Sequence, residues 1–266
     1  LQFDAESIDF VIITHNHIDQ TGRLPFLVKN GFHKSIYMTS ETSYLIGSAL
    51  HDSCSVLDDF ARHTNTYPLY NQQDVDSTLE HIVPCEFEEE INVLPTVRVT
   101  FFMNGHLPGA AITLVQISYS EYEDINLLFT GDYNNKNMFF DVKHLPKWVK
   151  KLPITIIQES TYGNVTSQEA NVKKFENNLL NAIAAKKTVL ACVFSLGRAQ
   201  EILYTIKQLQ DLGNLDKSIP VYFDGKLAFK YTSIYLSGKL NIKEDMQDFL
   251  PEHLVYLDSQ SRSSIL

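Results

Sequence analysis

Two histidines and an aspartate at alternating positions, His15, His17 and Asp19, form the first cluster in the chain that could do chemistry. Imidazole nitrogens and carboxylate oxygens are the ligands that zinc-type cations take in proteins. Because one residue separates the histidines, both can project to one side at the end of an extended segment. The alternative is a pair of incidental surface histidines beside a polar turn, and the residues that follow favour the metal site.

Three more residues with ligand-type side chains, His106, Asp132 and Glu159, each follow a predicted strand. Each is weak on its own, because a histidine or aspartate after glycine usually belongs to a turn and a glutamate at a strand end can begin one. A metal site needs neutral imidazoles and ionised carboxylates that converge from several loops. In this order, at strand ends, the residues together predict such a site.

The elements that must position these side chains are short apolar strands that alternate with amphipathic helices. This order is typical of a layered α/β domain whose functional residues lie on loops at the strand ends. Strands are expected at 8–13, 35–39, 97–102, 112–119, 127–130, 154–157, 188–194 and 221–223, and helices at 22–29, 41–61, 70–82, 169–186 and 197–212.

Strand-helix units repeat after residue 151, which predicts a second α/β domain with a parallel sheet. We place the boundary near residues 160–170, with a first domain over 1–160 and a second over 161–266. The chain opens almost directly on a strand and begins with Leu rather than Met, so we expect an upstream segment to be missing.

Composition restricts the class of protein. With 266 residues, 44% of them hydrophobic and 20% charged, the chain has the composition of an ordinary globular protein. No apolar run approaches the roughly 18 residues that a membrane helix needs. Three widely spaced cysteines favour reduced thiols and a cytoplasmic location. The net charge of -10 argues against a surface that coats nucleic acid generally, but not against a local phosphate site beside bound metals.

The motifs around these residues resemble a known family. His15-Asn16-His17-Ile18-Asp19, Asn104-Gly105-His106-Leu107-Pro108-Gly109-Ala110 and Phe129-Thr130-Gly131-Asp132 resemble the metallo-β-lactamase fold hydrolases. Three later motifs resemble the β-CASP branch, the nucleases of RNA processing and DNA repair, and in particular its bacterial and cleavage/polyadenylation-factor-like RNases. These motifs are Glu159-Ser160-Thr161-Tyr162-Gly163, Gly197-Arg198-Ala199-Gln200-Glu201 and Pro220-Val221-Tyr222-Phe223-Asp224.

The resemblance implies an α/β fold, a metallo-β-lactamase αββα sandwich with an inserted β-CASP α/β domain, both truncated here. It implies metal ligands His15, His17 and His106 for a first zinc, with Asp132 bridging to a second. Asp19 would hold the second zinc and orient the attacking hydroxide, and Glu159 would orient a histidine that protonates the leaving group. Two such metals would neutralise the attacking and leaving oxygens of a phosphodiester.

The chain departs from the family at Gln20, where a further histidine ligand is usual. A neutral amide is a poor zinc ligand beside imidazole, so we expect one zinc site and a weakened or lost second site. The family's two late histidines fall beyond residue 266, and His253 matches a non-catalytic stretch. Either the chain is a divergent member, or it is truncated and Gln20 was introduced to disarm it.

The sequence therefore predicts a zinc-dependent hydrolase that cleaves single-stranded RNA, with no membrane partner. The alternative is a catalytically degenerate paralogue that binds RNA or a partner nuclease without cleaving, and Gln20 favours it. Homo-oligomerisation is compatible with both. A small-molecule hydrolase of the same fold is disfavoured by the inserted second domain. The residues that bind substrate are not identified by any motif.

Overall fold

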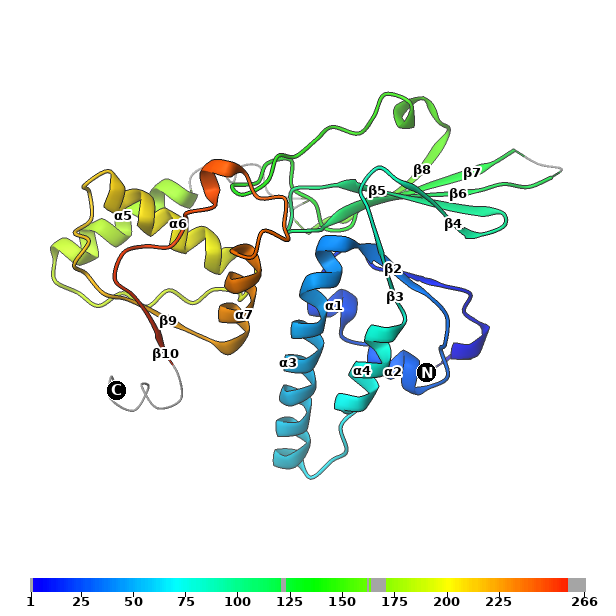
Figure 1. Cartoon of the computed structure of the whole chain (residues 1–266), viewed down its shortest axis with the longest axis horizontal. Coiled ribbons are helices and arrows are strands. Elements are labelled where there is room, and N and C mark those ends of the chain that lie inside the picture. Colours follow the sequence, from blue (N-terminus) through cyan, green and yellow to red (C-terminus); the bar gives the residue numbers. More distant parts are fainter. Residues whose placement is uncertain (1, 121–122, 162, 164–170, 258–266) are drawn as a thin grey trace. The chain divides into compact units, whose positions relative to one another are not determined.

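The computed structural model describes residues 2–120, 123–161, 163 and 171–257. It contains two compact units, the first made of Leu1–Glu159 with Gly238–Asn241 and the second of Ser160–Ser237 with Ile242–Leu266. Helices and strands occur in both units (Figure 1), which confirms the predicted α/β class.

Within its described residues, the first unit holds two sheets, one of three strands in the order β1-β2-β3 and one of five strands in the order β4-β5-β6-β7-β8. The small sheet is parallel, and the large sheet is antiparallel except for the parallel pair β7-β8. The elements are η1 (Ala5–Ser7), β1 (Val11–Ile12), α1 (Ile18–Thr21), α2 (Leu24–Lys29), β2 (Ile36–Thr39), α3 (Ser40–Thr64), α4 (Gln72–Glu80), β3 (Ile82–Cys85), β4 (Glu90–Leu94), β5 (Val97–Met103), β6 (Ala111–Ile117), β7 (Ile125–Phe129), η2 (Val149–Lys151) and β8 (Ile154–Ile157).

Helices α2, α3 and α4 cover one face of the small sheet. Ile36 and Met38 of β2 are fully buried in one apolar cluster with Ile46 and Leu50 of α3 and Val75 of α4. Alternate residues of β2 point to opposite faces, so Tyr37 lies on the other side. The small sheet therefore forms the layer between these helices and the large sheet.

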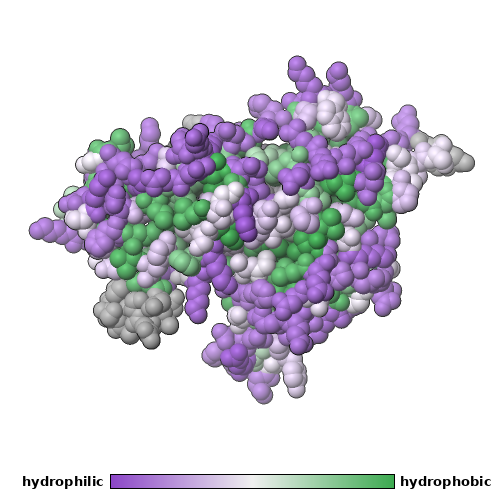
Figure 2. Space-filling view, viewed as in Figure 1, coloured by the Kyte–Doolittle hydropathy of each residue, from purple (hydrophilic) through white to green (hydrophobic). Residues whose placement is uncertain are grey.

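The two sheets pack face to face. Tyr37 and Val83 of the small sheet pack against a cluster that contains Val99, Phe101 and Val115 of the large sheet. Hydrophilic side chains cover the lower part of α3 and α4 in the view of Figure 2, and apolar atoms gather near β2 and β3. Helix, sheet and sheet thus form successive layers, as in the predicted sandwich.

The outer face of the large sheet is covered by a short irregular segment. Phe102, Leu114 and Leu128 point to this side and pack with Val149 of η2 and the partly buried Leu152. Among the described residues this cover contains a 3-10 helix rather than the α-helix of a full αββα sandwich.

The second unit contains α5 (Asn171–Ala184), α6 (Arg198–Asp211), β9 (Val221–Asp224), α7 (Lys226–Tyr235), η3 (Glu244–Met246) and β10 (Leu254–Leu257). Strands β9 and β10 pair in parallel, as expected for this region. Leu179 of α5 and Leu209 of α6 belong to its apolar core. Gln200 is fully buried and donates to Thr232 Oγ1 at 2.9 Å, which joins α6 to α7.

Two predicted elements are wrong. The helix expected over 70–82 ends at Glu80, and the next residues form the strand β3. The strand expected over 188–194 is not formed, and Leu190 and Phe194 are 88% and 80% exposed. A strand needs a hydrogen-bonded neighbour, and within the described part of the second unit β9 pairs with β10 alone.

The three cysteines are free thiols, with Cys54 and Cys85 buried and Cys192 exposed. Burial raises the pKa of the Cys85 thiol to about 11. No helix within the described ranges is long and apolar enough to cross a membrane.

Candidate metal centre

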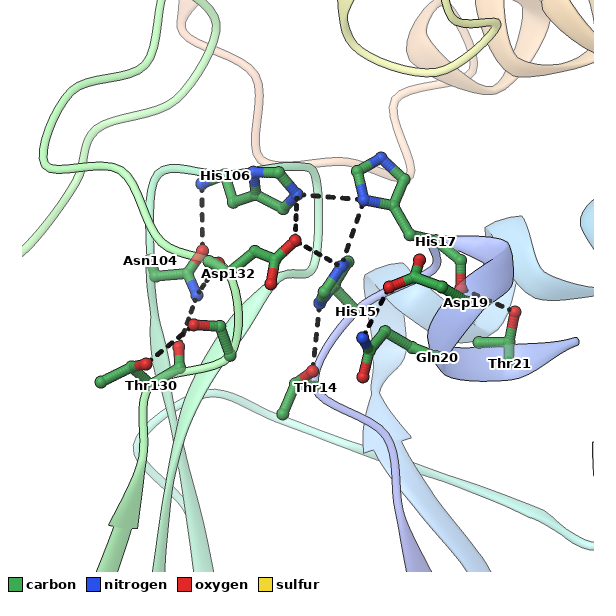
Figure 3. Close-up of polar contacts among 11 residues, drawn as sticks. Thr14, His15, His17, Asp19, Gln20, Thr21, Asn104, His106, Thr130 and Asp132 are labelled. Atoms are coloured by element: carbon green, nitrogen blue, oxygen red, sulfur yellow. Dashed lines mark hydrogen bonds and ion pairs between the residues drawn. The ribbon is translucent and has the colours of Figure 1, made fainter. Parts of the chain in front are cut away.

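Four of the predicted ligands lie at strand ends of the first unit, where their loops meet. His15 follows β1, and His17 is the residue that precedes the first turn of α1. His106 follows β5, and Asp132 follows β7. One nitrogen of each histidine and one oxygen of the aspartate all lie within 4.8 Å of one another. Figure 3 shows the three rings pointing toward one another beside the Asp132 carboxylate.

The spacing of these atoms suits a metal ion. His17 Nδ1 lies 3.2 Å from His15 Nε2 and 3.1 Å from His106 Nε2. Nitrogens about 2.0–2.1 Å from a tetrahedral zinc ion lie roughly 3.3 Å apart, so the three donors have nearly the separation that one ion requires. Asp132 Oδ2 is 3.7 Å from both His15 Nε2 and His106 Nε2, which adds a carboxylate at the edge of the same site. The residues present therefore fit a divalent metal.

His15 is held in the form that binds metals. Its side chain is fully buried, and Thr14 Oγ1 lies 3.0 Å from its Nδ1. A hydrogen bond donated by Nδ1–H to this hydroxyl leaves the Nε2 lone pair directed at the centre. Burial, with smaller contributions from His106 and His17, lowers the pKa of His15 to about 3. The ring is therefore neutral at physiological pH, as a metal ligand must be.

Three carboxylates lie close enough to influence one another. Burial raises the pKa of Asp132, and the negative charges of Asp19 and Glu159 raise it further. Carboxylates brought together in this way repel one another unless a cation lies among them. The acidic side of the site thus provides a second reason to expect bound metal.

Asp19 lies in α1, outside the group of four converging ligands. Its Oδ2 accepts a hydrogen bond from Gln20 Nε2 at 2.8 Å. Burial raises the pKa of Asp19, but the Gln20 bond, a backbone donor and the charges of His15 and His17 bring it below its usual value. The Gln20 amide therefore gives Asp19 an N–H donor in the place where the family pattern supplies a metal-binding imidazole.

Glu159 follows β8 at the same end of the large sheet as Asp132. Its backbone N–H donates to Thr130 Oγ1 at 3.2 Å, which fixes the residue beside the loop that leads to Asp132. It is not one of the four converging ligands, but its charge raises the pKa of Asp132. Glu159 is thus adjacent to the metal centre rather than part of it.

Asn104 is a positioning residue that ligand spacing alone could not identify. Its side chain is buried, and Nδ2 donates to the backbone oxygens of Thr130 and Asp132 at 3.2 and 3.0 Å. Its Oδ1 accepts from the N–H of His106 at 3.0 Å. One amide therefore fixes the loop of His106 relative to the loop of Asp132. In the sequence, this role is indicated only by the position of Asn104 two residues before His106.

We expect Asn104→Ala to weaken divalent-metal binding about 10- to 100-fold, because residues that orient metal ligands have effects of this size. Competition with a chelating indicator would measure the dissociation constant. Asn30→Ala is the matched control, since Asn30 Nδ2 donates to Phe26 O at the end of α2. Equal losses for both variants would contradict the role of Asn104.

Known proteins resemble the chain in sequence along most of its length. Residues 1–137 match the family model described as the Metallo-beta-lactamase superfamily. The chain is 31% identical over 255 residues to the transcription termination factor FttA of Methanosarcina mazei, an alignment that covers 93% of this chain and 38% of the relative.

Two further relatives are named as ribonucleases. Ribonuclease TTHA0252 of Thermus thermophilus is 31% identical over 235 residues, which cover 88% of this chain and 50% of the relative. Endoribonuclease ysh1 of Aspergillus fumigatus is 30% identical over 245 residues, which cover 88% of this chain and 26% of the relative. The chain thus spans half or less of the length of these curated relatives.

Proposed function

Because the chain belongs to the metallo-beta-lactamase superfamily, we propose that it acts as a metal-dependent phosphodiesterase that hydrolyses single-stranded RNA. The observation that carries this proposal is the convergence of His15, His17, His106 and Asp132. Relatives named as a ribonuclease and an endoribonuclease, which match along 88% of the chain, support RNA as the substrate.

The chain's own residues have distinct proposed roles. His15, His17, His106 and Asp132 would hold a zinc ion, which when bound activates water and neutralises phosphate charge. The Asp19 carboxylate, with its lowered pKa, is ionised and can accept a hydrogen bond from the attacking water. Glu159, which follows β8, would orient the group that gives a proton to the leaving oxygen.

A second candidate function is RNA binding without cleavage, as a catalytically degenerate subunit of an RNA-processing assembly. The hydrogen bond from Gln20 to Asp19 favours it, because this donor occupies a carboxylate oxygen that would otherwise be available to a second metal. Under this alternative the chain holds one metal, which stabilises the fold. Both candidates place the same four side chains around the first ion.

Metal counting and RNA cleavage, measured on the full-length protein, test the first function. We expect one tightly bound metal with Gln20 present, and a second with Gln20→His, because an imidazole is a far better ligand than an amide. Cleavage of a labelled single-stranded RNA should then rise with occupancy of the second site. Elemental analysis and gel electrophoresis give the two readouts.

Gln20→Ala is the matched control, since it removes the hydrogen bond to Asp19 without adding a ligand. It should bind one metal and show no gain in cleavage. If Gln20→His binds two metals and still leaves the RNA intact, hydrolysis is excluded, and RNA retention in a filter-binding assay would then support the second function.

The remaining assignments belong to the same proposal. Residues 1–160 form the metallo-β-lactamase domain, and 161–266 form part of a β-CASP domain. Three free thiols suit a cytoplasmic location. Besides RNA, the partner would be a second copy of the chain or another nuclease.

A further inference from the structure

A buried carboxylate contacts the loop that contains His106 and is used by none of the roles above. Glu41 stands in the first turn of α3 and is 5% exposed. A buried ionised carboxylate is costly unless donors surround it. The hydrogen-bond donors around the Glu41 carboxylate therefore show which segments it holds together.

Among the described residues, three hydrogen bonds reach the Glu41 carboxylate, and all come from outside its own helix. Oε2 accepts from the backbone N–H of Gly109 at 2.9 Å. Oε1 accepts from the backbone N–H of Asn241 at 3.2 Å and from its side-chain Nδ2 at 2.6 Å. One carboxylate thus joins the loop that contains His106 to Gly238–Asn241, the segment of the first unit that comes from far along the chain.

Gly109 is held on both of its backbone groups. Its carbonyl oxygen lies 2.7 Å from Thr39 Oγ1 and 3.1 Å from Thr42 Oγ1, and both hydroxyls are buried. Its φ of +75° suits glycine, and an added Cβ would lie 2.4 Å from the backbone N of Thr42. The junction of β2 and α3 therefore fits closely around this one residue.

The loop between Asn104 and Ala110 transmits this restraint to His106. Asn104 N–H donates to Ala110 O at 3.0 Å, and Ala110 N–H donates to Leu107 O at 3.0 Å, so the loop is closed on itself. Asn104 holds the His106 backbone from one side, and Gly109 is the fixed point on the other. A displacement of Gly109 would therefore move the His106 imidazole relative to His17 and Asp132.

The segment Gly238–Asn241 is also held against α3 by contacts that do not involve Glu41. Lys239 Nζ lies 5.2 Å from the centre of the Tyr44 ring, within the range of a cation–π contact, and Leu240 is buried. These contacts of the two preceding residues place Asn241 next to Glu41. Burial raises the pKa of Glu41 despite these three donors, so loss of any donor should weaken the ionised form further.

We propose that Glu41 is a positioning residue for the metal centre, and that its carboxylate couples the His106 loop to Asn241. This inference rests on the metal site of the proposed function, but not on RNA as its substrate. It assigns a role in metal binding to a residue at position 241, more than 130 residues after His106 in the sequence.

Divalent-metal affinity of the full chain tests the coupling, with Co²⁺ as a probe whose visible spectrum reports ligand geometry. Glu41→Gln should weaken binding about tenfold, the lower end for residues that act behind the ligands, and should alter the Co²⁺ spectrum. Asn241→Ala should cost roughly threefold, because the Gly109 bond remains. Asn241→Asp should cost at least as much as Glu41→Gln, since two carboxylates would then face each other.

The double variant Glu41→Gln/Asn241→Asp should bind the metal at least about threefold more tightly than Asn241→Asp alone. In it the amide can donate to the new carboxylate while its oxygen still accepts from Gly109 N–H, so the side-chain hydrogen bond runs in the reverse direction. The backbone N–H of Asn241 loses its acceptor in this variant, so the rescue is partial. A residue that merely stabilises the fold would show no such rescue of the spectrum. Glu80→Gln, an exposed glutamate of α4, is the matched control.

Three results would overturn the inference. Wild-type metal affinity in Glu41→Gln would contradict this inference but not the proposed function. The same holds if the affinities follow the melting temperatures of the metal-free variants and the double variant shows no rescue. Absence of metal binding by the unchanged protein would sink both this inference and the proposed function. If Glu41→Gln fails to fold, the variants at the exposed Asn241 decide the question.

Discussion

The variant His106→Ala is expected to lose divalent-metal affinity by more than about 100-fold, because changes behind the ligands alone cost about 10- to 100-fold. His106 Nε2 lies 3.1 Å from His17 Nδ1 and 3.7 Å from Asp132 Oδ2, so its removal opens one side of the site. Titration with a competing chelator would measure the loss. Any RNA cleavage by the full-length protein should fall with it.

In mild acid and without metal, the same variant should be more stable than the unchanged protein. His106 is among the causes that lower the pKa of His15, after burial. Without this neighbour, protonated His15 is less strongly disfavoured, and the metal-free site costs less to form in mild acid. Opposite signs for affinity and stability are typical of a functional site.

His144→Ala is the matched control for both measurements, since His144 is exposed and is not one of the clustered ligands. It should change neither metal affinity nor metal-free stability. If His106→Ala kept the wild-type affinity, the four-ligand centre would be the wrong site.

The candidate metal centre could be predicted from the sequence because its residues follow strands. Four predicted ligands, His15, His17, His106 and Asp132, converge. Strand ends in a layered α/β domain lie at one edge, so a residue just after each strand is placed by the sheet itself. Asp19 and Glu159 lie beside the cluster, and their catalytic roles stay predictions.

The errors in the fold have a common cause, which is that the sequence does not show what lies beside a strand. Ile82–Cys85 contains Pro84, which seldom occurs inside a sheet, yet β3 is at the edge of its sheet and tolerates it. Glu90–Leu94 is likewise an edge strand with an exposed, acidic start, and it was not predicted. Conversely, the apolar run at 188–194 has the composition of a strand without pairing as one.

The residues behind the ligands were not predictable for a different reason. Glu41 and Asn241 are 200 positions apart, and no periodic pattern links them. Glu41 alone suggests only a favourable acidic residue in the first turn of a helix. Its three external donors become visible only when the fold brings Gly109 and Asn241 to it.

The second large effect is acid destabilisation of the metal-free protein. Burial, then His106 and His17, lower the pKa of His15 from 6.5 to about 3 in the folded chain, while nearby Asp19 acts in the opposite direction. An unfolded chain therefore takes up this proton near pH 6.5 and the folded chain does not. The contribution of His15 to stability is fully present above pH 6.5 and is lost as the pH falls toward 3.

Between those limits one such group changes the free energy of unfolding by about 1.4 kcal/mol per pH unit. Urea unfolding with a chelator present, at several values between pH 6.5 and pH 5, would show the decline before most carboxylates titrate. His15→Gln should flatten it by about 1 to 2 kcal/mol across this range, whereas exposed His144→Gln should leave it unchanged.

With metal bound, the pH dependence of stability should have a different cause, because protons then compete with the ion for the neutral imidazoles. The metal-loaded protein is thus expected to be more stable than the metal-free protein at pH 6.5, and to lose the difference as acid displaces the ion. Parallel pH profiles for the unchanged protein and His15→Gln would show that His15 is not held neutral. The inference that His15, His17 and His106 form a preformed set of neutral metal ligands would then be wrong as well.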